Sequence, residues 1–286
     1  MLGTGPSAFR EVVASAIDSH AVQSDAWTKA REAAAAAGVE LRPLTTLADA
    51  DGMVRIMIAT WGEQLIRREM LRALGDSGNV PWGAFDGVEL IGFVLGWIGE
   101  DPEGGLHVHS HLLATVPDRR HRGVGYALKL AQRAQTLDHG IHVVRWTVDP
   151  LVARNAHFNI TKLGAVCDHF HRNFYGDMTD TLNRGERSDR LVVRWDLDRE
   201  PTGPAPAEGV VVLDAEGDAP VLRAVEVPAA GAPLLVRIPR EYQDLRERDP
   251  ALAARWREAA GDAIEACFAS GRIVTGFTSD SAYVLT

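Results

Sequence analysis

Three arginines, a histidine and two glycines stand close together in the stretch RRHRGVGYALKL, residues 119–130. The residues before it read as a strand and those after it as a helix, so Gly123 to Ala127 should form the first turn of that helix. The first backbone N–H groups of a helix have no partner inside it and carry the positive end of the helix dipole. Glycine lets an anion approach this backbone without meeting a Cβ, and arginines add charge-assisted donors. The stretch therefore predicts a binding site for one compact anionic group.

The glycines fit neither of the two commonest nucleotide-binding loops. A P-loop requires a Lys followed by Ser or Thr after its last glycine, and a dinucleotide fingerprint requires a third Gly or Ala where this chain has Leu128. Nucleic acid is also excluded as the main partner. The chain has 30 Lys and Arg against 39 Asp and Glu, a formal net charge of −9, whereas neutralising phosphates requires a basic surface. A coenzyme or another small anion remains.

Three histidines alternate just upstream in the stretch HVHSH. Alternating residues of a strand lie on one face, so His107, His109 and His111 should point the same way. An imidazole with a pKa of about 6.5 suits a general base near neutral pH, which makes His109 and His111 the candidates. The same spacing, together with His169 and His171, would also permit a zinc site for hydrolysis. A structural role, with hydrogen bonds to neighbouring strands, is the third interpretation.

The elements that must position these groups follow from hydrophobic periodicity and turn residues. We expect helices over 8–37, 47–74 (bent near Gly62), 124–137 and ARNAHFNITKLGA. We expect strands over 39–44, 106–116 and 141–148, in CDHFHRNFYG and DRLVVRWDL, and in a hairpin that turns at Asp86-Gly87. This order predicts an α+β fold of three layers, α/β/α, with helices on both faces of a mixed central sheet.

Composition suggests where the chain divides. The stretch EPTGPAPAEG reads as a linker, and a small α+β module with a long helix between Asp249 and Gly271 follows it. We therefore expect an N-terminal helical extension, a core, a linker and a C-terminal module, over 1–38, 39–198, 199–209 and 210–286.

The remaining composition points to a cytoplasmic protein. Cys167 and Cys267 are too few for a disulfide framework and read as buried, reduced thiols. No stretch approaches the ~20 apolar residues of a membrane span, and the first residues lack the apolar core of a signal peptide.

The pattern RxxGxG, here Arg120-His121-Arg122-Gly123-Val124-Gly125 between a strand and a helix, resembles the coenzyme A signature of the GNAT superfamily of N-acyltransferases. The order of elements over residues 39 to about 198 is similar to the fold of that superfamily. Downstream, RNAHFNITKLGA resembles its next motif, in which an Asn and a Lys-Leu-Gly flank a helix beside the pantetheine arm. The chain also resembles a bacterial group of predicted GNAT proteins that carry a C-terminal extension like residues 210–286.

The resemblance implies acetyl-CoA or another acyl-CoA as co-substrate, and no metal. Amides at the helix start and the neighbouring arginines would hold the pyrophosphate. Main-chain groups of the preceding strand would pair with pantetheine, and one of its N–H groups would polarise the thioester carbonyl. The implied coenzyme-binding residues are Leu113, Ala114, Val116, Arg120, Arg122, Gly123, Val124, Gly125, Tyr126 and Asn155.

The catalytic residues depart from the pattern of the superfamily. Many members place a carboxylate base on the strand before the signature, where this chain has histidines, and His109 comes nearest to that position, with His111 as the second candidate. Many members also use a Tyr on the helix of the last motif as general acid, but that position holds Ile160. Tyr175 and Tyr126 are the candidate replacements.

The resemblance implies an acyl-CoA-dependent N-acyltransferase that moves an acetyl group, or a larger one such as succinyl, to a small-molecule amine by direct transfer in a ternary complex. Trp61 and Arg154 are the candidate acceptor-binding residues. We expect neither a nucleic acid nor a membrane as partner, and the C-terminal module either covers the acceptor side or forms a homodimer contact. A zinc-dependent hydrolase, a non-catalytic acyl-CoA-binding protein and a decarboxylating GNAT-like protein are the alternatives.

Overall fold

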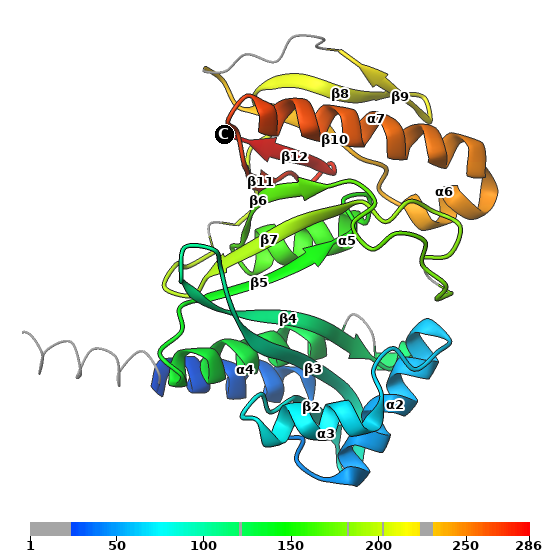
Figure 1. Cartoon of the computed structure of the whole chain (residues 1–286). Coiled ribbons are helices and arrows are strands. Elements are labelled where there is room, and N and C mark those ends of the chain that lie inside the picture. Colours follow the sequence, from blue (N-terminus) through cyan, green and yellow to red (C-terminus); the bar gives the residue numbers. More distant parts are fainter. Residues whose placement is uncertain (1–23, 120–121, 182, 202, 224–230) are drawn as a thin grey trace, which may run out of the picture. The chain divides into compact units, whose positions relative to one another are not determined.

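The structure is a computed structural model that describes residues 24–119, 122–181, 183–201, 203–223 and 231–286. The chain divides after His142 into two compact units, 1–142 and 143–286, and each is described by itself. Both units combine strands with packed helices (Figure 1), so the α+β class predicted from the sequence is confirmed. No helix in the described part of the chain is both long and apolar enough to cross a membrane.

The first unit contains four strands in the order β1-β2-β3-β4, all antiparallel. Their bounds are β1 Glu40–Pro43, β2 Trp82–Asp86, β3 Glu89–Glu100 and β4 Leu106–Thr115. The predicted hairpin turn is confirmed, because Gly87 between β2 and β3 has the positive φ of 58° that glycine tolerates best.

Helices α2 (Leu47–Trp61) and α3 (Arg68–Asp76) cover one face of this sheet. Thr46 begins α2 with a capping box, in which its hydroxyl accepts from the Asp49 amide at 3.1 Å. The single bent helix predicted over 47–74 is instead two helices, because Gly62 adopts a left-handed φ of 81° and ends α2. Apolar residues of both helices pack with β3 and β4 in a core that includes Met53, Ile56, Met57, Leu71, Phe93, Leu95 and Leu112.

Helix α4 (Val124–Asp138) and the helix described over 24–37 cover the other face. The apolar stripe predicted for α4 is buried at Ala127, Leu130, Ala131 and Ala134. The N-terminal helix docks through Trp27, whose indole N–H donates to Asp138 at 2.7 Å. The predicted helix over 8–37 is thus confirmed from residue 24, and its earlier residues lie outside the described part.

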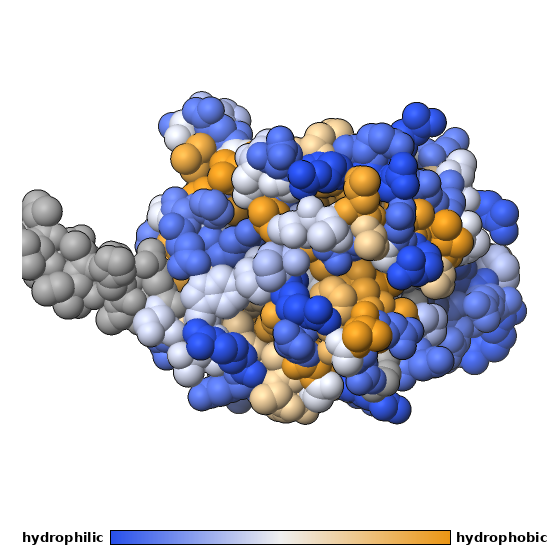
Figure 2. All heavy atoms as spheres, turned by 90° about the horizontal axis from the view of Figure 1, so that it is seen from below, coloured by the Kyte–Doolittle hydropathy of each residue, from blue (hydrophilic) through white to orange (hydrophobic). Residues whose placement is uncertain are grey.

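Seen from below, the surface of the molecule carries hydrophobic areas separated by hydrophilic residues (Figure 2).

The second unit contains strands in the order β5-β7-β6-β11-β12-β10-β8-β9. Among the strand pairs of its described residues, only β10 and β8 are parallel neighbours. Cys167 of β6 pairs with Val274 of β11, so strands from both sides of the predicted linker share one sheet. The boundaries at 198 and 210 stay a prediction. The strand bounds are β5 Val143–Val148, β6 Val166–His171, β7 Arg190–Asp196, β8 Val210–Glu216, β9 Ala219–Leu222, β10 Leu234–Arg237, β11 Val274–Phe277 and β12 Ala282–Leu285.

The helices of this unit are α5 (Ala153–Ala156), α6 (Tyr242–Arg248) and α7 (Pro250–Ala269), with a π-helix at His157–Lys162. The prediction for α7 is confirmed, because the Asp249 side chain accepts from the Leu252 amide at 3.0 Å and Pro250 opens the first turn. The helix predicted over ARNAHFNITKLGA is an α-turn that widens into the π-helix. Both cysteines are free and buried, as predicted.

Candidate functional site

The start of α4 is built on a glycine backbone. Gly123 caps the helix with a left-handed φ of 86° and no side-chain cap, and its carbonyl accepts from the amides of Tyr126 and Ala127 at 3.0 Å each. The amides of Val124 and Gly125 come before these, where a helix has no acceptor of its own to offer. Beside them Arg122 is exposed. Arg120 and His121 lie outside the described residues.

Gly123 and Gly125 are glycines for different reasons. At Gly123 the left-handed backbone disfavours any residue with a Cβ. At Gly125 the backbone is helical, and an added Cβ would meet only Leu113 Cδ2 at 3.7 Å, an ordinary contact. The packing of the protein therefore does not require a glycine at 125. A bare backbone there would leave room for a group that approaches from outside the fold.

The strand that leads to this helix carries a β-bulge at His111. Leu112 pairs with Leu95 and Ser110 with the next residue, Gly96, so His111 is the extra residue of β4. The bulge reverses which face the even-numbered residues occupy. Ser110 points to α4, where it bonds Lys129, whereas Leu112 packs in the core beneath α2 and α3. Strict alternation, predicted for this strand, therefore holds only up to the bulge.

Two of the three histidines gather on one tryptophan. The ring of Trp97 lies 5.1 Å from that of His109 and 4.7 Å from that of His111, and the two imidazoles are 5.7 Å apart. Burial, with smaller contributions from His111, His107 and Lys129, lowers the pKa of His109 to about 4. Burial also lowers the pKa of His111. His109 is therefore neutral at pH 7 and has a free nitrogen lone pair to offer, although the low pKa makes it a weaker base than an ordinary histidine.

A buried lysine lies behind β4, and the sequence reasoning missed it. Lys129 is 3% exposed, and its ammonium donates to Ser110 Oγ at 2.7 Å and to Gln132 Oε1 at 3.2 Å. Burial lowers its pKa from 10.5 to about 7. No signal in the sequence could have located it, because helical spacing places residue 129 on the face opposite the apolar stripe of Ala127, Leu130, Ala131 and Ala134.

Of the strand residues predicted to bind the coenzyme, some direct their main-chain N–H groups towards β3 and one directs its own away from β3. Val116 N–H donates to Ile91 O at 2.8 Å, and Phe93 pairs with Ala114 in the same register. Because hydrogen-bonded and non-hydrogen-bonded pairs alternate in an antiparallel ladder, Ala114 and Val116 direct their N–H groups to β3. Leu113 directs its own away from β3. Of the three strand residues predicted to bind the coenzyme, Leu113 is therefore the one with main-chain groups to offer, and the N–H of Val116 is already engaged.

The other candidates lie on different elements. Trp61, the last residue of α2, is half-buried and packs against the core beneath α2 and α3, which accounts for it without a ligand. In the second unit, Arg154 and Asn155 are exposed on α5. Ile160, where the superfamily pattern has a tyrosine, is buried in the π-helix.

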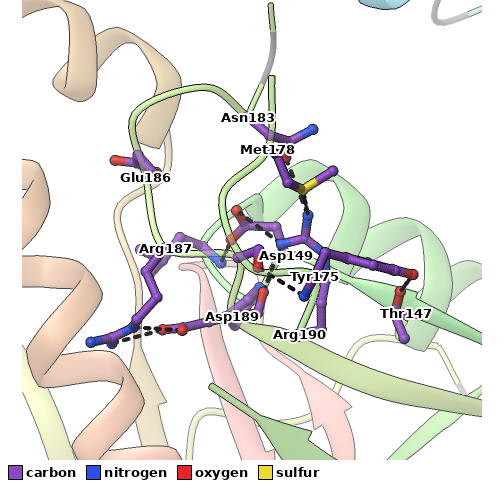
Figure 3. A network of polar contacts seen from close by, with 12 residues as sticks. Thr147, Asp149, Tyr175, Met178, Asn183, Glu186, Arg187, Asp189 and Arg190 are labelled. Atoms are coloured by element: carbon purple, nitrogen blue, oxygen red, sulfur yellow. Dashed lines mark hydrogen bonds and ion pairs between the residues drawn. The ribbon is translucent and has the colours of Figure 1, made fainter. Parts of the chain in front are cut away.

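Tyr175 follows β6 and is 43% exposed. Its hydroxyl shares a hydrogen bond of 2.9 Å with Thr147 of β5, and the guanidinium of Arg190 lies over its ring at 5.3 Å from the centroid. Figure 3 shows this tyrosine at the edge of a polar network around Asp149, Asp189 and Arg190.

No group of three or more His, Cys, Asp and Glu side chains in the described part of the chain is arranged to hold a metal ion. His169 and His171 stack on each other, with ring centroids 6.4 Å apart and planes 9° apart. His169 Nδ1 also contacts Asp168 Oδ1 at 3.0 Å.

Comparisons with known proteins agree with these features. A sequence model of the acetyltransferase (GNAT) family matches residues 50–164, which include β4, the glycine-capped start of α4 and α5. Among curated proteins, none matches the chain. Similar solved structures include the Escherichia coli ribosomal-protein-S18-alanine N-acetyltransferase, which is 15% identical over 59% of this chain and 99% of its own, with a TM-score of 0.46.

Two more solved structures come from eukaryotes. Arabidopsis thaliana NAA60 in complex with acetyl-CoA is 20% identical over 56% of this chain and 99% of its own, with a TM-score of 0.45. Chaetomium thermophilum Naa20 in complex with a bisubstrate analogue is 16% identical over 55% of this chain and 86% of its own, with a TM-score of 0.47. Residues 50–164 of the chain thus match the model of the acetyltransferase (GNAT) family, which confirms the resemblance seen in its sequence.

Proposed function

We propose that the protein is an acyl-CoA-dependent N-acyltransferase, with acetyl-CoA or a larger acyl-CoA as donor and a small-molecule amine as acceptor. The observation that carries the proposal is Gly125, whose missing side chain leaves the first amides of α4 open to a pyrophosphate although the fold has room for a Cβ. Arg122 is exposed beside these amides and supplies positive charge. The match of residues 50–164 to an acyltransferase family supports the same assignment.

The proposed reaction is a direct transfer. The neutral amine attacks the thioester carbonyl, an N–C bond forms, the C–S bond breaks, and coenzyme A leaves as the thiolate. The proton lost by the amine passes to His109, which is neutral at pH 7 because burial lowers its pKa to about 4. An N–H of β4 that points away from β3, that of Leu113, is the proposed donor to the developing oxyanion. Tyr175 is the proposed proton donor to the thiolate.

Several finer points belong to this proposal. The resemblance assigns Asn155 and Arg154 to the coenzyme arm and the acceptor, and both are exposed on α5. We also propose a cytoplasmic location, which the two free, buried cysteines support. The neighbours solved with bisubstrate analogues make a peptide N-terminus the second acceptor class to test.

Calorimetric titration with coenzyme A and with acetyl-CoA tests the donor site. Gly125→Asp places a carboxylate where the pyrophosphate should lie and should abolish binding. Gly75→Asp is the matched control, because Gly75 lies in α3 with no atom within 4 Å of an added Cβ. Gly125→Ala should fold normally and weaken binding. Wild-type protein that binds neither nucleotide would end the acyltransferase proposal.

The acceptor is tested by release of free thiol from acetyl-CoA and succinyl-CoA across a panel of amines, amino acids, aminoglycosides and short peptides. Turnover on a small amine supports the proposal, and turnover only on peptides would replace its acceptor class. Binding of acyl-CoA with no thiol released from any amine would favour the non-catalytic or decarboxylating alternative.

A further inference from the structure

The turn between β5 and α5 comes just before Asn155, the predicted coenzyme-binding residue of the second unit. It consists of Asp149, Pro150 and Leu151, and the exposed residues Arg154 and Asn155 follow within one helical turn. Asp149 folds the turn by accepting the Leu151 amide at 2.8 Å. Local contacts add little to fix the direction in which α5 leaves: the Asp149 carbonyl accepts a long bond of 3.4 Å from the Val152 amide, and Val152 at the N-cap provides no side-chain cap.

Long-range contacts fix that direction instead. Arg257 of α7 donates to both oxygens of Asp149 at 2.9 Å each, a bidentate pair across 108 residues of sequence. Its side chain is 6% exposed and that of Asp149 is 19% exposed, so the pair is shielded from water. Glu186 accepts a further bond from Arg257 at 2.5 Å and one from the Tyr242 hydroxyl at 2.7 Å. Asp149 holds the pKa of Arg257 above its usual range although burial acts to lower it.

A second contact acts on the same turn from a different element. The hydroxyl of Tyr283 in β12 donates to the carbonyl of Pro150 at 2.7 Å, and this side chain is fully buried. Arg257 and Tyr283 both belong to the C-terminal module, and they bond two consecutive residues of the turn, Asp149 and Pro150. Other ion pairs of α7 join it to residues outside the turn. Arg172, next to β6, pairs with Glu258, Asp262 and Glu265 of that helix and does not reach the turn.

We propose that the C-terminal module is a positioning element of the coenzyme site, in which Arg257 and Tyr283 hold the Asp149–Leu151 turn and thereby set the placement of Asn155. This inference rests on the proposed function in one respect, namely that Asn155 contacts the bound coenzyme. It gives the module a role in donor binding, where the sequence led us to expect a role on the acceptor side or in a dimer contact.

Hydrogen exchange followed by mass spectrometry tests whether Arg257 and Tyr283 hold the Asp149–Leu151 turn. Tyr283→Phe removes one hydroxyl, and Arg257→Met removes the bidentate pair. Tyr283→Phe should speed exchange of peptides spanning 149–156 by about tenfold, roughly the effect of losing one buried hydrogen bond, and Arg257→Met, which loses two bonds to Asp149, should speed it further. Arg172→Met should speed exchange in α7 and leave 149–156 unchanged. Unchanged exchange at 149–156 in both Tyr283→Phe and Arg257→Met would overturn the proposal. If Arg257→Met does not fold, Tyr283→Phe decides.

A double-mutant cycle on the dissociation constant of coenzyme A tests whether the turn places Asn155 for coenzyme binding. Asn155→Ala should weaken binding in wild-type protein and should have a several-fold smaller effect in the Tyr283→Phe background, because the turn no longer presents Asn155. In Tyr283→Phe and in Arg257→Met the KM for acetyl-CoA should rise with little change in kcat. Arg257→Lys keeps the charge but loses the planar guanidinium, so it should bind coenzyme A more tightly than Arg257→Met and less tightly than the wild type. Fully additive effects would overturn the positioning role.

The two proposals fail in different ways. Wild-type protein that does not bind coenzyme A contradicts the proposed function, while the exchange experiment still decides whether the module holds the turn. Wild-type protein that binds, with variants Tyr283→Phe and Arg257→Met binding equally well, contradicts the positioning role alone.

Discussion

Replacing the buried Lys129 by Met should flatten the dependence of stability on pH. In the folded protein the ammonium lies between α4 and β4, and burial lowers its pKa from 10.5 to about 7. Between these two values the unfolded chain binds a proton that the folded chain does not. The free energy of unfolding of the wild type therefore rises with pH over this window, and the gain is complete above the unfolded pKa.

The magnitude follows from the shift. Each pH unit inside the window changes the free energy of unfolding by about 1.4 kcal/mol, so the wild type should gain about 2.5 kcal/mol between pH 7.5 and 9.5 from this group. Lys129→Met removes the contribution. The variant also leaves Ser110 Oγ and Gln132 Oε1 without the lysine donor, at a cost of about 1–3 kcal/mol. That cost lowers the free energy of unfolding by the same amount at every pH, so it does not change the slope of this free energy against pH.

Urea denaturation at several pH values, followed by tryptophan fluorescence, measures the slope for each protein. Lys29→Met is the matched control, because the Lys29 side chain is 40% exposed and pairs with Asp25 at 3.2 Å on the surface of its helix, and it should keep the wild-type slope. Equal slopes for Lys129→Met and the wild type would show that the folded protein accommodates this charge without loss and would refute the reasoning.

Four further outcomes are expected. The rate with a neutral amine should show no inflection between pH 6 and 9 from His109, because its pKa of about 4 leaves it uncharged there; an inflection in the wild type that His109→Asn removes would contradict this. Since the unfolded chain takes up that proton at a higher pH than the folded chain, His109 should also make the protein lose stability as pH falls from about 6.5 towards 4. Thr46→Ala should lower the free energy of unfolding by about 1 kcal/mol through loss of the capping box, measured by urea denaturation. Gly123→Ala should cost about 1 kcal/mol through its left-handed φ of 86°, whereas Gly125→Ala should be close to neutral for stability.

Local patterns predicted most of the elements, because strand alternation, helical stripes and glycine stops are properties of neighbouring residues. They could not predict the extra residue at His111, since a bulge leaves the alternation of HVHSH unchanged in the sequence. They also could not predict the π-helix at His157–Lys162, whose residues fit an α-helix equally well.

The features of the site that escaped prediction are long-range or buried. A lysine on a helix is usually exposed, so Lys129 was not expected in the interior. The pair between Asp149 and Arg257 joins residues 108 positions apart, which no local pattern encodes. The glycine signature of α4 was predictable because its chemistry needs only consecutive backbone groups.

The pairing of β6 with β11 also bears on how the protein is made. β6 ends at His171, whereas its neighbour in the sheet begins only at Val274. During synthesis the edge of β6 therefore stays open, with unpaired backbone groups, until nearly the whole C-terminal module has emerged. A chain that stops before β11 would leave both this edge uncovered and the β5–α5 turn without Tyr283, so truncated products should aggregate and be removed before they compete for coenzyme.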